Sequence, residues 1–259
     1  MDFLIAVPIG FVLGFLIGLT GVGGGALVAP AIYVLLGRDY GEAVALSLIY
    51  SLFTKIFGAI QHSRQGTVLW RLTFLYGLTG IPGSVLGSRF VYLASSETQR
   101  AFPFLMGGLL LFVAALMLME TWARTVAAWE KPFSPNQITW PCALGVGLFQ
   151  LGVGALMGVT SIGSGSLVIL SMVYLFRMSA REIVGSNIVI ALIMVIPAGL
   201  THYLAGGVDW RLLAVLLAGS LVGTVLGSRS AMLLPDRALK VAIVVLLVAG
   251  AASTIAKAW

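Results

Sequence analysis

Two clusters of glycine and hydroxyl side chains stand out chemically in an otherwise apolar chain. The first contains Thr20, Gly21, Gly23, Gly24 and Gly25; the second contains Thr160, Ser161, Gly163, Ser164, Gly165 and Ser166. Each cluster is followed by about ten apolar residues, enough for a half-helix. The first N–H groups and the positive dipole end of a helix attract anions, and hydroxyl groups add donors. We therefore expect these residues to bind a small anion.

Two other interpretations of the clusters have less support, and a third stays open. A nucleotide phosphate loop needs a Lys-Ser/Thr pair, and none follows the first cluster. A serine hydrolase built on Ser164 and His202 would want a glycine where Ile162 stands. We therefore expect no enzyme activity. The glycines can also serve close helix packing alone, as small residues do in membranes.

Three polar residues within the apolar segments are further candidates for the substrate site. Lys55 is the charged residue that lies well inside such a segment. Intramembrane charge marks functional sites, although a lysine near a helix end can also extend to the membrane surface. Ser47 and Asn187 follow two similar helix starts and are candidates for the polar lining.

The two histidines, His62 and His202, occupy matching places near the ends of two apolar segments. Histidine titrates near neutral pH, so this pair is a candidate for proton coupling. Hydrogen bonding at a helix end is the other interpretation. Two histidines without nearby carboxylates do not make a metal site, and we expect neither metal nor cofactor. Glu42 and Glu182 fit capping boxes that begin with Asp39 and Ser179.

The composition is that of an integral membrane protein. The chain has 259 residues, of which 59% are hydrophobic and 9% charged, whereas soluble domains have about 25% charged residues. Apolar runs recur along the whole length, as expected for several membrane spans. The net charge of +6 fits basic loops at a membrane surface, and we expect no nucleic-acid partner. A single cysteine, Cys142, excludes an internal disulfide.

An internal duplication appears when the sequence is shifted by 140 residues. Gly83–Arg89 then falls on Gly223–Arg229 with six identities in seven, and Trp70–Leu72 falls on Trp210–Leu212. We expect one transporter domain over residues 1–259, with one repeat at about 1–122, a linker at about 123–138 and a second repeat at about 139–259. Gly83-x-x-x-Gly87 and Gly223-x-x-x-Gly227 predict close helix packing.

The predicted fold is an all-α polytopic membrane protein whose repeats have four to five segments, the first helix of each being broken by glycine. If the chain crosses straight through each break, the repeats are parallel. If each break turns the chain back, the repeats are inverted. The second arrangement divides the Lys and Arg residues of the loops 5 against 9, and the first divides them 6 against 8. The larger asymmetry favours inversion.

The duplicated glycine segment resembles the TauE/SafE sulfite exporter family, as do Glu42 and the stretch Arg181–Asn187. The likeness covers essentially the whole chain. It implies a multi-pass transporter of the bacterial inner membrane for small sulfur-containing anions such as sulfite, sulfoacetate or other organosulfonates, often acting in export. Ser164 departs from the all-glycine form of the first cluster.

We therefore expect a secondary transporter of a small anion within the lipid bilayer, acting as an exporter. A passive anion channel and import by proton symport are the alternatives. The sequence is also compatible with a homodimer.

Overall fold

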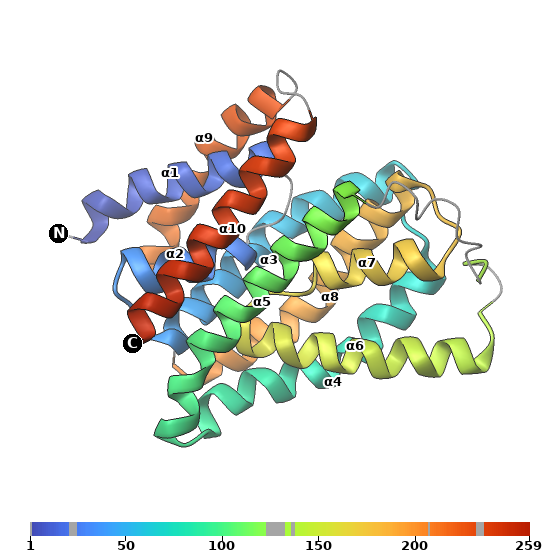
Figure 1. The fold of residues 1–259 in the computed structure, drawn as a ribbon, viewed down its shortest axis with the longest axis horizontal. Coiled ribbons are helices and arrows are strands. Elements are labelled where there is room, and N and C mark those ends of the chain that lie inside the picture. The colour runs from blue at the N-terminus through green and yellow to red at the C-terminus, as the bar shows by residue number, and fades with distance from the viewer. Residues whose placement is uncertain (1, 21–24, 123–132, 136–137, 207, 232–235) are drawn as a thin grey trace.

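The computed structural model describes the chain except residues 1, 21–24, 123–132, 136–137, 207 and 232–235. The regular structure of this part is helical, apart from an isolated bridge between Phe133 and Phe176 (Figure 1). The helices are α1 (Asp2–Thr20), α2 (Gly25–Leu35), α3 (Tyr40–Arg64), α4 (Trp70–Leu93), α5 (Ser96–Trp122), α6 (Trp140–Thr160), α7 (Ser166–Leu175), α8 (Ala180–Leu204), α9 (Trp210–Ala231) and α10 (Asp236–Ala258). The all-α prediction is thus confirmed for the described residues.

Six helices in the described part of the chain are long and apolar enough to cross a membrane: α3, α5, α6, α8, α9 and α10. The protein is therefore a multi-pass membrane protein. The helices α2 and α7 have 11 and 10 residues. At 1.5 Å per residue each covers about 15 Å, or roughly half of a 30 Å hydrocarbon core.

α1 and α2, which flank the first break, run in opposite directions. α1 runs parallel to α9, because Gly10 packs against Leu216 and Gly18 against Thr224. The beginnings of α3 and α9 lie together, because Arg38 pairs with Asp209. α1 therefore begins at this end of the bundle, and α2 returns to it because only residues 36–39 separate α2 from α3.

α6 and α7, which flank the second break, also run in opposite directions, starting at the opposite end of the bundle. α6 runs parallel to α4, because Gly83 packs against Leu151 and Gly87 against Ala155. Before α6, the N–H of Phe133 donates to the carbonyl oxygen of Leu175 at the end of α7, at 3.1 Å. α7 therefore returns to the end where α6 begins. Of the two arrangements that the sequence left open, the structure has the one in which each break reverses the chain.

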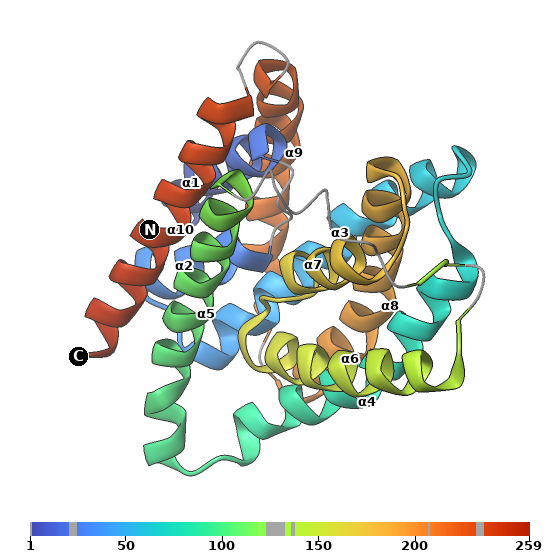
Figure 2. The same ribbon diagram turned by 45° about the vertical axis from the view of Figure 1, so that its right-hand side comes forward.

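Helices from the two halves of the chain are interlocked, with α1 packed on α9 and α6 on α4 (Figures 1 and 2). At both contacts, backbones approach so closely that a Cβ on the glycine would collide with the facing main chain. This holds for Gly83 and Gly87 against α6, and for Gly223 and Gly227 against Phe11 and Phe15. The predicted packing role of both glycine pairs is confirmed.

The antiparallel pair α3 and α8 forms the centre of the bundle. Gly58 faces Ile188 near one end of the pair and Gly199 faces Ile49 near the other. The short helices α2 and α7 pack on α3 and α8 respectively. The short helix that follows each break thus lies against the long central helix of its own half.

Candidate functional site

A cavity of about 240 Å³ lies where the two broken regions meet between α3 and α8. Its wall includes eight of the predicted substrate-binding residues: Gly25, Lys55, Ser161, Gly163, Ser164, Gly165, Ser166 and Asn187. Because a water molecule takes about 30 Å³ in the liquid, this volume suits a small molecule of a few heavy atoms.

The first turns of α2 and α7 both contribute to this wall. α2 begins at Gly25 and α7 at Ser166, and both residues line the cavity. A Cβ on Gly25 would collide with the carbonyl oxygen of Ser161, so the two broken regions are in direct contact. N–H groups in the first turn of a helix have no intrahelical acceptor, and each helix start carries about half a positive charge. At α7, the N–H groups of Leu167 and Ile169 donate to the carbonyl oxygens of Gly163 and Gly165, at 3.2 and 3.0 Å. Two such starts around one small cavity make an environment that favours an anion.

The chain reverses after α6 through a left-handed residue and a glycine. Ser161 has a φ of 62°, the one positive φ of a non-glycine residue in the described chain. Gly163 has a φ of 111°, which side chains rarely adopt. A non-glycine residue in this region costs about 1–2 kcal/mol, and such strain gathers at functional sites.

The hydroxyl groups of the second break are divided between structural bonds and the cavity. Thr160 donates from Oγ1 to the carbonyl oxygen of Leu156 at 2.7 Å and accepts from the N–H of Ile162 at 3.1 Å. It therefore closes the end of α6 and is not part of the cavity wall. Ser47, also a predicted site residue, does not line the cavity, but its Oγ is hydrogen-bonded at 2.9 Å to the Oγ of Ser161, which does.

Lys55 contributes the ammonium group of the cavity wall, and its Nζ donates to Ser51 Oγ one turn earlier on α3. The described residues of the wall include no aspartate or glutamate. The lysine charge and the two helix starts thus have the same sign. Coulomb attraction between an anion and this lysine is stronger where protein surrounds the pair than in water.

Asn187 is the polar side chain that α8 places at the cavity. It is 8% exposed, and its Oδ1 is a buried atom with no hydrogen-bond partner among the described residues. Buried polar atoms are normally paired, so this group has capacity for a ligand.

The two histidines lie apart from the cavity and from each other. His62 is near the end of α3, where its Nδ1 lies 2.9 Å from Thr67 Oγ1. His202 is fully buried near the end of α8. Its Nε2 donates to the carbonyl oxygen of Gly158 at 3.0 Å, so its Nδ1, 2.8 Å from Tyr92 Oη, accepts from that hydroxyl when the ring is neutral. Both rings thus make helix-end hydrogen bonds.

Four predicted residues of the first break are not located. Gly21, Gly23 and Gly24 lie outside the described residues, and of Thr20 only its place as the last residue of α1 is described. Conversely, Thr54 and Thr224 line the cavity although sequence analysis did not identify them. The position of Thr54 next to Lys55 is a weak sequence signal that it belongs to the site. The sequence has no such signal for Thr224, because this residue comes from α9, in the other half of the chain from Lys55.

The chain matches the family described as "Sulfite exporter TauE/SafE" over residues 6–254. The chain belongs to this family. The match covers nearly the whole sequence, including both breaks and all helices that surround the cavity. The resemblance inferred from the glycine clusters is confirmed, and the protein is a TauE/SafE membrane transporter of the sulfite exporter type.

Relatives of this TauE/SafE protein are similar in length to it. It is 35% identical over 229 residues to the "Probable membrane transporter protein YjnA" of Bacillus subtilis (strain 168), which covers 85% of this chain and 86% of the relative. It is 26% identical over 233 residues to YdhB of the same organism, covering 90% and 92%. A probable membrane transporter protein of Xylella fastidiosa (strain 9a5c) is 24% identical, covering 87% and 83%. No solved structure matches the chain.

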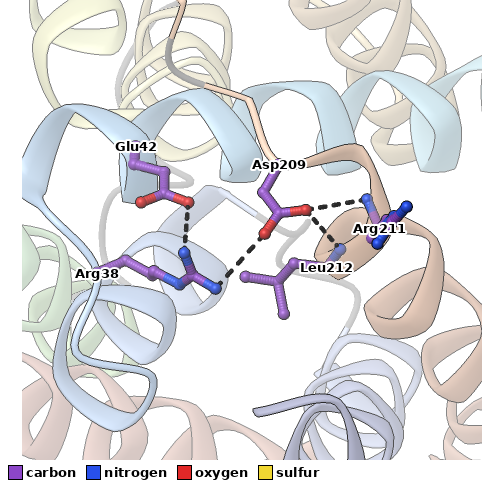
Figure 3. A network of polar contacts seen from close by, with 5 residues as sticks. All are labelled: Arg38, Glu42, Asp209, Arg211 and Leu212. Atoms are coloured by element: carbon purple, nitrogen blue, oxygen red, sulfur yellow. Dashed lines mark hydrogen bonds and ion pairs between the residues drawn. The ribbon is translucent and has the colours of Figure 1, made fainter.

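The TauE/SafE transporter also has a polar network at the end where α3 and α9 begin (Figure 3). Arg38 Nη1 lies 3.2 Å from Glu42 Oε1, and its Nη2 lies 3.5 Å from Asp209 Oδ2. Asp209 Oδ1 accepts from the N–H groups of Arg211 at 3.0 Å and Leu212 at 3.1 Å. The network lies in the wall of a recess of about 1080 Å³.

One of the two predicted capping boxes is wrong. Ser179 and Glu182 form the complete box at the start of α8, but the side chain of Asp39 makes no cap bond at α3. The reason is Arg38, which binds Glu42 and draws this carboxylate away from the backbone that a capping box needs.

Proposed function

We propose that the protein is a secondary transporter that exports a small sulfur-containing anion, such as sulfite, sulfoacetate or another organosulfonate, across the bacterial inner membrane, without catalysis. One observation carries this proposal. Two helix starts, the serine-rich second break and Lys55 surround one small cavity whose described wall has no carboxylate. Helix starts pointing at an anionic group between broken helices are a recurring design of secondary transporters.

We also infer that the two halves are an inverted duplication. Three pairs of helices begin 140 positions apart: α3 and α8 at residues 40 and 180, α4 and α9 at 70 and 210, and α5 and α10 at 96 and 236. The central pair α3 and α8 runs antiparallel. In inverted-repeat transporters, alternating access comes from rocking of one half against the other around a site at their interface. The contribution of both halves to the cavity wall supports this mechanism.

The charges of the two ends give the orientation of the protein in the membrane, and the membrane potential gives the direction of transport. In the part of the chain that the structure describes, seven Lys and Arg residues fall on the side away from the chain ends. Five fall on the side where the chain begins and ends, namely Arg38, Arg89, Arg100, Arg211 and Lys257. By the positive-inside rule, the side with more of these residues is cytoplasmic. An inside-negative potential then favours anion exit by about 2.3 kcal/mol per charge per 100 mV, so export needs no coupled ion. Neither histidine lines the cavity, so the proposal assigns them no proton-coupling role.

The test is flux in proteoliposomes loaded with radiolabelled sulfite, sulfoacetate or taurine, with and without a pH gradient. The proposal expects saturable efflux and counterflow without a pH gradient. Continuous conductance in planar bilayers would show the alternative, a passive anion channel. Flux that requires a proton gradient would show proton symport. If none of these three compounds moves or stabilises the protein, the sulfur-anion assignment is wrong.

A further inference from the structure

The amide of Asn187 differs in chemistry from the rest of the cavity. The other polar side chains of the wall are the Lys55 ammonium, which only donates, and hydroxyl groups, which can rotate to donate to an anion. Asn187 brings an acceptor oxygen as well as an NH2 group. A fully deprotonated oxyanion has only acceptors, so it can satisfy the NH2 group and leaves the oxygen without a donor.

That oxygen has no hydrogen-bond partner in the part of the chain that the structure describes. Four buried side-chain atoms of the described residues lack a hydrogen bond, on Thr73, Ser88, Gln150 and Asn187. Among these residues, Asn187 lines the cavity. Its neighbour Ile188 packs on Gly58, three residues from Lys55, so Asn187 and Lys55 lie at a similar level of the central helix pair. A ligand held at Lys55 is therefore close to the amide.

We propose that Asn187 determines specificity by selecting anions that carry their own hydrogen-bond donor, such as a hydroxyl group or the acid proton of a singly protonated oxyanion. This inference rests on the proposed function. The anionic group faces Lys55 and the start of α7, and the donor of the ligand binds Asn187 Oδ1. A site with a buried polar group strongly rejects a ligand that lacks the matching group, because the polar group then stays unpaired. An apolar pocket distinguishes a methyl from a hydroxyl group much less strongly.

The test compares two sulfonates of equal size that differ in one group. 2-Hydroxyethanesulfonate has a hydroxyl where 1-propanesulfonate has a methyl. Dissociation constants for both, and for sulfite, are measured by ligand-induced thermal stabilisation of the purified transporter. The wild-type protein should bind the hydroxyl compound about tenfold more tightly. Asn187→Leu should reduce this ratio to about one, mainly by weakening binding of the hydroxyl compound.

Gln150→Leu is the matched control. Gln150 is also a buried amide with an unpartnered oxygen, but it lies outside the cavity wall, so this variant should keep the tenfold ratio. If Asn187→Leu does not fold, Asn187→Ser, which carries the residue found at the matching position 47, should lower the ratio to between one and ten.

Each other outcome overturns a defined claim. Equal binding of the two sulfonates by the wild-type protein overturns this inference and leaves the proposed function standing, as does an unchanged ratio in the folded Asn187 variants. Binding of neither sulfonate nor sulfite overturns both claims.

Discussion

Ser47 Oγ on α3 lies 2.9 Å from Ser161 Oγ, so a side chain of one half of the chain holds the broken region of the other half. Ser161 is also the residue whose backbone has the left-handed φ of 62°. Its hydroxyl bond and its backbone strain therefore have opposite effects on stability. The two effects can be separated by substitution.

Replacing Ser161 with glycine and with alanine separates them. Both variants lose the bond to Ser47, which is worth about 1 kcal/mol. Alanine retains the left-handed strain, whereas glycine relieves it. We expect Ser161→Gly to be more stable than Ser161→Ala by about 1 kcal/mol, as measured by thermal unfolding in detergent. An alanine variant at least as stable as the glycine variant would contradict the strain at this position.

Gly25→Ala should abolish transport in a protein that remains folded. The added methyl group collides with the carbonyl oxygen of Ser161 and pushes the start of α2 away from the second break. The measurement is anion efflux from proteoliposomes at matched protein content. Gly108→Ala is the control, because a Cβ at this helical glycine meets no atom within 4 Å. Equal efflux from both variants would show that transport does not need the contact between the two breaks.

The sequence predicts where the helices of this fold begin and end better than it predicts which helices pack together. The 140-residue offset relates the starts of α3 and α8 because helix starts depend on local signals, such as the cap at Ser179. Local signals do not report that α1 packs on α9 or that Thr224 reaches the cavity, since these depend on how the halves interlock. The failure at Asp39 has a different, local cause, because its neighbour Arg38 pairs with the Glu42 that the capping box needs.

Asp209 should stabilise the transporter mainly as a helix cap. Asp209→Asn keeps an acceptor for the N–H groups of Arg211 and Leu212 but loses the charge that pairs with Arg38. Because a partly exposed ion pair contributes at most about 1 kcal/mol, we expect a small loss that disappears at high salt. Asp209→Ala also loses the cap, which is worth about 1 kcal/mol, and should be less stable at every salt concentration. Salt-dependent thermal unfolding in detergent checks this, and equal effects of the two substitutions would refute the capping role.

Lys55 should contribute to anion affinity more than to stability. Lys55→Met keeps most of the side-chain volume and removes the ammonium group, so the cavity retains only the helix starts and neutral polar groups. We expect binding of sulfite or an organosulfonate to weaken at least tenfold, about 1.4 kcal/mol, with little change in the unfolding temperature of the ligand-free protein. Lys55→Arg preserves the charge and should bind more tightly than Lys55→Met.

Lys257→Met is the control, because this lysine lies in the wall of the larger recess and binds the carbonyl oxygen of Tyr33. If Lys257→Met weakens anion binding as much as Lys55→Met does, the anion is attracted by the general charge of the protein, and the ammonium group in the cavity has no special role.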